Sequence, residues 1–385
     1  MEHISYTARI GDAIWCIDYN SEYDYSEIID YLNSENFRTF GDGLSAVILP
    51  KANSGESAID CLKRRCKEKE IDMTNELASV NTIKSWFSGG ERPKKGEESR
   101  RKMFLIAFAL ALTVEETKYL MQKVFLDRAF NPRNPKELVY YYCIENGYSL
   151  KRANEMISKI NIDNTETEDK TVFTEMLASI TERVKKDDEL IDYINSHPHN
   201  FSINNVAAKK AVAEYITKAK SCVAKEIESP AYEAGEDKNG KTYHIKDGKN
   251  TDSINFMYEI ITGQSVTGEK GTKSIFKNAE LPKEIKVNFP EAATFSKKEP
   301  SYDELRKMLI VLFSYWFWYN MPSENEDGDL FDDYIAQLND LLFRTGLPEI
   351  YPGNPFDWMF CFCTTEHNPL DTFRTIIAEA LEMVD

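Results

Sequence analysis

The 385-residue sequence predicts a mainly α-helical, multi-helical protein with few short strands. Two capping boxes, Thr113…Glu116 and Ser301…Glu304, are each followed by apolar residues at three- and four-residue spacing. A capping box satisfies backbone amides that would otherwise lack partners at a helix start, so it identifies that start by a physical mechanism. The chain shows no series of alternating apolar and polar residues of the kind that a large sheet requires.

The same apolar spacing predicts further helices along the chain. We expect them near residues 26–33, 57–69, 99–112, 136–146, 150–160, 171–195, 206–227, 252–262, 329–344 and 370–383. The aromatic-rich run MLIVLFSYWFWYNM (308–321) is too short to span a bilayer and is expected to form a core helix. Asn354-Pro355 is expected to start another helix, with Asp357 capping it or pairing with a cation such as Arg374.

Three short stretches could form strands without changing the fold class. ARIGDAIWCIDY (8–19) and GLSAVILP (43–50) are rich in strand-forming residues. NGKTYHIKDGKN (239–250) has the pattern of a polar hairpin, because Asn-Gly and Asp-Gly turn pairs flank a short central run. No internal repeat is evident in the sequence.

Composition excludes disordered and fibrous classes, since 42% of the residues are apolar and 12% are aromatic. The N-terminus, MEHISYTARIGDAIWCIDY, has acidic residues where a secretory signal needs a basic start and an apolar run. The seven cysteines are scattered and odd in number, so we expect buried structural thiols and a cytoplasmic location.

Charge is unevenly distributed in a chain whose net charge is −17. Residues 57–160 contain 20 Lys and Arg against 14 Asp and Glu, which leaves the rest of the chain strongly acidic. A local basic segment fits contact with phosphates, although a solvated helix face explains the same charges equally well. Within NTIKSWFSGG (81–90), Ile83, Trp86 and Phe87 share one helix face, and the Gly pair can end the helix.

The order of three segments adds a family resemblance. TIKSWFSGGERP (82–93), SRRKMFLIAFALALTVEETKYLMQKV (99–124) and NPRNPKELVYYYCIENGYSLKRANEMI (131–157) resemble Cro/repressor-like helix-turn-helix proteins of the xenobiotic-response-element type from Gram-positive bacteria. The resemblance covers about residues 80–158 and implies a helix-turn-helix-like fold with a two-helix extension. One departure is clear: Leu77-Ala78 are followed only by Ser79 to Asn81 before Thr82, so the first helix of the motif is shortened or rebuilt.

The resemblance implies a DNA-binding surface. Its groove contacts would be Asn81, Thr82, Lys84 and Ser85, and its phosphate contacts would be Arg92, Lys94, Lys95, Arg100 and Arg101. Ile83, Trp86, Phe104, Phe108 and Leu112 would belong to the core.

Signals for other chemistry are weak. GQSVTGEKGTKS (263–274) approaches a phosphate-binding loop, but Glu269 replaces its lysine, and the preceding INFMYEII reads as a helix capped by Gly263. His197-Pro198-His199 lacks the further ligands that a metal site needs. We therefore predict no catalytic residue, metal or cofactor, and do not expect an enzyme, unless a large pocket holds a buried carboxylate or histidine with a shifted pKa.

The predicted organisation has five parts. They are an N-terminal mixed segment (1–56), a helix-turn-helix-like module with its extension (57–160), a helical region (161–228), a loop-rich connection (229–300) and an aromatic-rich helical domain (301–385). The leading hypothesis is a bacterial cytoplasmic DNA-binding or regulatory protein whose acidic helical region dimerises or binds a partner protein. The alternative is an interaction or scaffold protein, in phage defence or stress response, whose helix-turn-helix fold does not bind DNA. Neither hypothesis involves a membrane.

Residues 229–250 contain few apolar side chains that could anchor them to a core. Limited proteolysis under native conditions should therefore cut there before it cuts within 99–158. Mass spectrometry of the earliest fragments would locate the cuts, and a first cleavage inside 99–158 would contradict this division.

Overall fold

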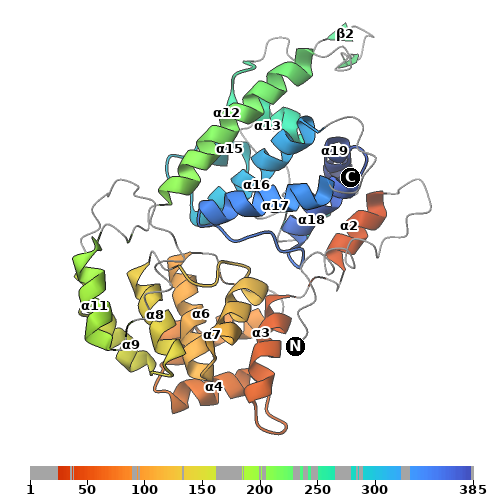
Figure 1. The fold of residues 1–385 in the computed structure, drawn as a ribbon. Coiled ribbons are helices and arrows are strands. Elements are labelled where there is room, and N and C mark those ends of the chain that lie inside the picture. Colours follow the sequence, from red (N-terminus) through yellow and green to blue (C-terminus); the bar gives the residue numbers. More distant parts are fainter. Residues whose placement is uncertain are drawn as a thin grey trace. The chain divides into compact units, whose positions relative to one another are not determined.

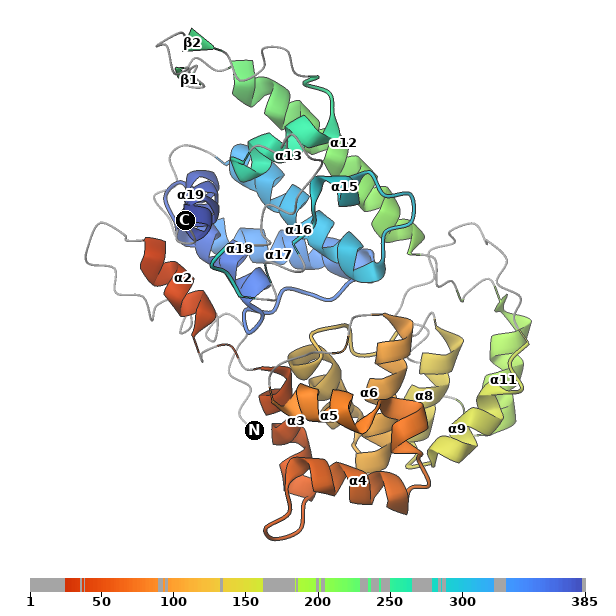
Figure 2. The same ribbon diagram turned by 180° about the vertical axis from the view of Figure 1, so that it is seen from behind.

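A computed structural model describes residues 25–34, 37, 39–88, 93, 96–131, 134–161, 184, 186–198, 201, 205–228, 235–236, 242–243, 250–264, 279–282, 285, 289–321 and 330–382. The chain divides into two compact units, each built of helices (Figures 1 and 2). The N-terminal unit comprises Arg38–Ala207 and Phe343–Pro348. The C-terminal unit comprises Met1–Phe37, Ala208–Leu342 and Glu349–Asp385.

The helices of the N-terminal unit follow one another with short connections. They are α3 (Phe40–Ile48), the 3-10 turn η1 (Leu49–Lys51), α4 (Ala58–Glu68), the π turn η2 (Met73–Leu77), α5 (Val80–Phe87), α6 (Glu97–Leu110), α7 (Val114–Tyr119), the π turn η3 (Leu120–Val124), α8 (Pro135–Glu145), α9 (Leu150–Ile157) and α11 (Asp187–Ser196).

The C-terminal unit combines the two ends of the chain. Its elements are α2 (Tyr25–Asn33), most of α12 (Val206–Glu228), the strands β1 (Gly235–Glu236) and β2 (Thr242–Tyr243), α13 (Ile254–Thr262), α15 (Ala292–Phe295), α16 (Tyr302–Tyr319), most of α17 (Leu330–Arg344), α18 (Pro355–Thr365) and α19 (Pro369–Glu382). In both ribbon views the red helix α2 lies against the blue helix α19, although they come from opposite ends of the sequence (Figures 1 and 2).

The predicted mainly helical fold is confirmed. Both capping boxes form, at the starts of α7 and α16, with each N-cap hydroxyl and each N3 glutamate in its expected role. Every predicted helix has a counterpart among the described residues, except that 171–183 lie outside them and only α11 represents the predicted helix 171–195. Gly263 ends α13 in a left-handed conformation, as predicted.

The three strand predictions have different outcomes. Residues 43–50 form the end of α3 and a 3-10 turn rather than a strand, because Thr39 caps the helix and Phe40, Leu44 and Ile48 form one buried face. The predicted hairpin 239–250 shares only β2 with the observed strand pair, in which Gly235 pairs with Tyr243 and Glu236 with Thr242, antiparallel; residues 239–241 and 244–249 lie outside the described residues. The predicted strand 8–19 lies outside the described residues.

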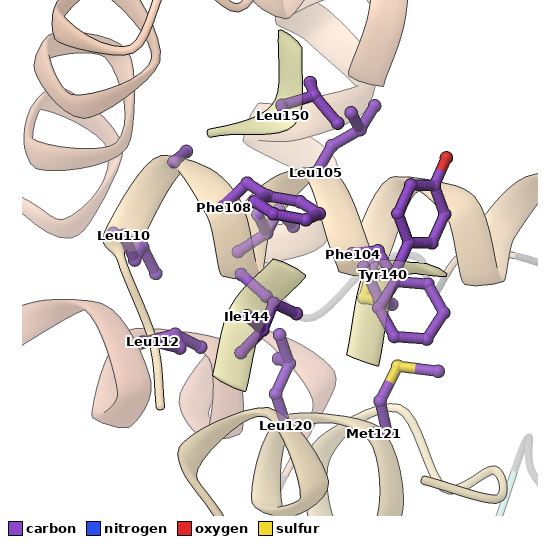
Figure 3. Close-up of a cluster of buried hydrophobic side chains, with 14 of the residues drawn as sticks. Phe104, Leu105, Phe108, Leu110, Leu112, Leu120, Met121, Tyr140, Ile144 and Leu150 are labelled. Carbon is purple, nitrogen blue, oxygen red and sulfur yellow. The ribbon is translucent and has the colours of Figure 1, made fainter. Parts of the chain in front are cut away.

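One continuous apolar core fills the N-terminal unit. Figure 3 shows side chains of α6, η3, α8 and α9 meeting in it, among them Phe104, Phe108, Met121, Tyr140 and Leu150. All five residues that the sequence assigned to the core are buried, namely Ile83, Trp86, Phe104, Phe108 and Leu112. The core extends to α3, so this unit begins before residue 57.

The buried face of helix α5 packs against α3. The ring of Phe40 meets the ring of Trp86 edge-to-face at 5.9 Å, and Trp86 is 2% exposed. Gly41 allows the two backbones to approach closely. A side chain there would overlap the carbonyl oxygen of Trp86 and lie 2.9 Å from the Cα of Phe87.

Helix α11 completes this unit by docking on α8 and α9. Asp187, its first residue, accepts hydrogen bonds from Tyr142 (3.2 Å) and from Nε of Arg152 (2.6 Å). Leu190 and Ile194, which lie on the inner face of α11, are fully buried. Apolar burial and charge-assisted hydrogen bonds therefore both fix α11.

The aromatic residues of the C-terminal unit form its core, as predicted. Trp358 is fully buried and its ring contacts Tyr31 of α2 and Phe362 of α18. Trp318 is 6% exposed and its indole donates to the hydroxyl of Thr364 at 2.9 Å.

Asp357 pairs with a cation, which was one of the two predicted alternatives, but the cation is not Arg374. Asp357 pairs instead with Arg306 of α16, at 2.7 and 2.8 Å. Arg374 pairs with Glu226 of α12 at 2.8 Å and donates to the carbonyl oxygen of Ile260. Each arginine thus joins a different pair of helices.

Six cysteines fall within the described ranges, and all six are buried free thiols, as predicted; Cys16 lies outside these ranges. Burial raises the pKa of Cys66 and Cys143 to about 12. Within the same ranges, no helix combines the length and apolar character that crossing a membrane requires.

Replacing Trp86 by alanine should lower the free energy of unfolding by roughly 3–5 kcal/mol, because a buried large aromatic side chain is lost and a cavity remains. Val80→Ala is the matched control on the same helix, since Val80 is 39% exposed. Chemical denaturation monitored by circular dichroism measures both changes. A loss below about 1 kcal/mol for Trp86→Ala would contradict its assigned position in the core.

Candidate nucleic-acid interface

The segment that resembles a helix-turn-helix consists of η2, two connecting residues and α5. Asp72 caps η2 by accepting hydrogen bonds from the amides of Thr74 (3.1 Å) and Asn75 (3.0 Å). Ser79 caps α5 by accepting from the amide of Thr82 at 3.2 Å. Only one turn of helix therefore precedes α5 at the position of the motif's first helix.

The outer face of α5 carries the predicted groove contacts unequally. Asn81 and Lys84 are exposed, while Thr82 and Ser85 are half-buried. The Thr82 hydroxyl also lies 2.9 Å from the Ser79 hydroxyl, so it is already hydrogen-bonded. Within the part of the chain that the structure describes, Lys84 makes no ion pair. Asn81 and Lys84 are thus the best-placed contacts.

Three of the predicted phosphate contacts, Arg92, Lys94 and Lys95, lie outside the described residues. Pro93 stands between them in sequence and is buried. These three positions remain predictions.

Arg100 was predicted to contact phosphate, and the structure contradicts this role. It is 4% exposed and its guanidinium makes two parallel hydrogen bonds to the carboxylate of Glu137, at 2.8 and 2.7 Å. Asp127 lies 3.0 Å away, and the carbonyl oxygen of Arg128 accepts at 2.8 Å. A guanidinium enclosed in this way cannot reach DNA.

Arg101 lies at the surface beside two acidic residues. Its side chain is 38% exposed and its nitrogens lie 3.5 Å from Glu76 and 3.8 Å from Glu98. Lys102 also reaches Glu98, at 3.9 Å. Partly exposed pairs of this kind contribute about 0–1 kcal/mol each, so an incoming phosphate could replace the glutamates.

Internal ion pairs also compensate the cations of α4. Arg64 binds Glu56 at 2.9 Å and Glu68 at 2.8 Å. Hydrogen bonds from Arg64 and from the amide of Asn53 lower the pKa of Glu56 to about 2. Lys63, Arg64 and Arg65 are therefore paired within the fold.

Sequence reasoning missed two exposed cations at the end of α4. Lys67 and Lys69 make no ion pair among the described residues and stand free in solvent. Charge counting included them within 57–160 but gave no reason to single them out, because nothing in their local sequence separates a paired from an unpaired lysine.

The described residues contain no candidate metal site. Among the described residues, no group of three or more His, Cys, Asp or Glu side chains could hold a metal ion. His197 stacks on Tyr193, with ring centres 4.4 Å apart, and its Nδ1 lies 3.0 Å from the Ser196 hydroxyl. His199 and residues 265–274 of the near-miss phosphate loop (263–274) lie outside the described residues.

No family model, curated protein or solved structure matches the chain. The case for any function therefore depends on the geometry of the chain itself and on the residues that carry the resemblance.

Replacing Arg100 by alanine should destabilise the protein by about 3–5 kcal/mol, because Glu137 and Asp127 would be left as uncompensated buried charges. The neighbouring Arg101→Ala removes the same side chain from the surface and should cost less than about 1 kcal/mol. Urea denaturation of the two variants makes the comparison. Equal losses would show that Arg100 is not buried as described.

Proposed function

We propose that this chain is a bacterial cytoplasmic DNA-binding or regulatory protein that contacts duplex DNA through α5. The observation that supports the proposal best is the two-sided character of this helix. Ile83 and Trp86 anchor its inner face in the core, while Asn81 and Lys84 point away from the core into solvent.

The size and chemistry of α5 suit a major groove. A helix of eight residues is about 12 Å long, close to the width of the groove. The amide of Asn81 offers both a donor and an acceptor to base edges, and Lys84 offers a cation to phosphate or guanine. Because α3 braces the inner face, the outer side chains are presented from a fixed backbone.

The expected electrostatic contribution is small. Lys84 and Arg101 together would neutralise about two phosphates, which corresponds to a salt slope of about −1.8. Arg92, Lys94 and Lys95 would make the slope steeper if they also reach the backbone. The net charge of −17 opposes association with another polyanion, so low salt does not guarantee tight binding.

The scaffold alternative has its own support. Arg100, Arg101 and Lys102 all have acidic partners within the chain, which reduces the charge available for DNA. In that case the exposed face of α5, which includes Val80, would contact another protein.

The decisive measurement is DNA binding by the full-length protein, followed by fluorescence anisotropy between about 50 and 200 mM salt. Arg101→Ala, which removes a predicted phosphate contact, should weaken binding to all sequences and reduce the salt slope by about 1. Asn81→Ala and Lys84→Ala, which remove predicted groove contacts, should each cost about 1–3 kcal/mol at a preferred site and less elsewhere. Lys151→Ala is the matched control, because Lys151 is an exposed lysine on α9.

The full-length chain is required because α3 belongs to the same core as α5. If the folded protein shows no salt-dependent binding, or if Lys151→Ala weakens binding as much as Lys84→Ala, α5 is not a DNA-binding helix. The scaffold hypothesis would then be preferred.

A further inference from the structure

Two helix starts in this chain have the same sequence pattern, Pro-x-Asn-Pro-x-acid. The residues are Pro132, Asn134, Pro135 and Glu137 before and within α8, and Pro352, Asn354, Pro355 and Asp357 before and within α18, each 220 positions later. A match of four residues in six is too short to be recognised as a repeat from the sequence alone. The hydrogen bonds show that the match extends to the structure.

At the first helix start, Asn134 is the N-cap and its side chain accepts from the amide of Lys136 at 3.0 Å. The Asn134 amide donates to the carbonyl oxygen of Asn131 at 2.8 Å. The amide of Asn131 donates to the carboxylate of Glu137 at 2.7 Å. A closed turn therefore precedes α8.

The second helix start repeats each of these bonds. Asn354 accepts from the amide of Phe356 at 3.1 Å, and its own amide donates to the carbonyl oxygen of Tyr351 at 2.8 Å. The amide of Tyr351 donates to the carboxylate of Asp357 at 2.8 Å. Every donor and acceptor is 220 positions after its counterpart.

A buried arginine from an earlier helix joins each turn. Arg100 of α6 and Arg306 of α16 are both 4% exposed. Arg100 binds both carboxylate oxygens of Glu137 through Nε and Nη2 at 2.8 and 2.7 Å, and Arg306 binds both carboxylate oxygens of Asp357 through Nη1 and Nη2 at 2.8 and 2.7 Å. Although burial alone would lower the pKa of Arg306, the adjacent Asp357 carboxylate raises it above its ordinary value.

The arginines also bind equivalent backbone carbonyls. Arg100 donates to the carbonyl oxygen of Ala129 at 3.3 Å, and Arg306 donates to that of Glu349 at 2.8 Å. Both carbonyls stand eight residues before the carboxylate that the same arginine binds. Each arginine therefore binds a carbonyl group before its turn and the carboxylate after it.

The helices that follow the two turns have buried residues at equivalent positions. Helices α8 and α18 both have 11 residues, whereas the next helices, α9 and α19, have 8 and 14. The buried residues 220 positions apart are Leu138, Val139, Tyr142 and Cys143 of α8 with Trp358, Met359, Phe362 and Cys363 of α18, and Ala153 and Met156 of α9 with Phe373 and Ile376 of α19.

The preceding turns agree as well. Leu126 has a positive φ of 58° and Gly346, 220 positions later, has a φ of 71°. Glycine adopts this conformation without strain, whereas leucine does so at a cost. The conformation at Leu126 is therefore explained by the turn it occupies rather than by its own preference.

We infer that the chain contains one helical framework twice, as α6–α9 and as α16–α19, each centred on a buried arginine that clamps an Asn-Pro helix start. The first copy carries α4 and η2 on α6, and the second carries α2 on α19. The framework is thus a support to which different helices are attached. This inference is independent of whether α5 binds DNA.

An exchange of segments tests the equivalence in the full-length protein. Residues 129–136 are given the sequence of residues 349–356, and Glu137 is retained. Tyr351 and Gly353 must move together, because a side chain at 353 would lie 2.5 Å from the Tyr351 hydroxyl. Thermal unfolding should remain cooperative, with a midpoint within about 5 °C of the parent.

The control is the same exchange with one glycine inserted after position 132, which shifts the turn out of register with Glu137. Its midpoint should fall by more than about 10 °C. If the two variants behave alike, whether both unfold or both stay folded, the shared register has no structural basis and the inference is wrong.

Hydrogen exchange provides a second measurement. Arg100→Lys keeps the charge but cannot form the paired hydrogen bonds, so exchange at the amides of Asn131 and Asn134 should accelerate at least about tenfold. Arg306→Lys should do the same at Tyr351 and Asn354. Each variant should leave the other turn unchanged. If the Tyr351 amide exchanges as slowly in Arg306→Lys as in the parent, the inference is wrong. If a lysine variant unfolds completely, the comparison of the two segment-exchange variants decides.

Discussion

The N-terminal unit depends on the acceptors and carboxylates that surround the buried guanidinium of Arg100. A guanidinium has five N–H donors and no acceptor, and its burial without partners costs several kcal/mol. Glu137 and two backbone carbonyl oxygens accept four hydrogen bonds from Arg100, and Asp127 adds a second carboxylate 3.0 Å away; all of these partners come from the loop after η3 and the first turn of α8. The loop conformation, the start of α8 and the position of α6 are therefore determined together.

The core assembled on α6 supports α5, which could not persist alone. An isolated helix of eight residues is unstable in water, so its stability comes from tertiary contacts and its cap. Trp86 supplies a tertiary contact near the C-terminal end of the helix, and Ser79 supplies the cap at its N-terminal end. The exposed side chains Asn81 and Lys84 contribute little to folding, which leaves them free to serve recognition.

The parts of the fold that could be predicted have local signals, and the parts that could not depend on distant residues. Capping boxes and apolar spacing identify helices within a single turn of sequence. A short apolar run such as 43–50 fits a strand or a buried helix equally, and the Thr39 cap together with the buried face of Phe40, Leu44 and Ile48 decides for the helix. Arg100 looked like a surface cation because its partner, Glu137, is 37 residues away. The outward positions of Asn81 and Lys84 could be predicted, since they oppose the apolar face.

The missing side chain at Gly41 has a consequence for how closely α5 can pack on α3. Because the backbones of α3 and α5 meet at this position, even the first carbon of a side chain would lie 2.4 Å from the carbonyl oxygen of Trp86. The neighbouring atoms are backbone and cannot turn aside, so any larger residue would separate the two helices. The close seating of α5 on α3 therefore depends on glycine at position 41.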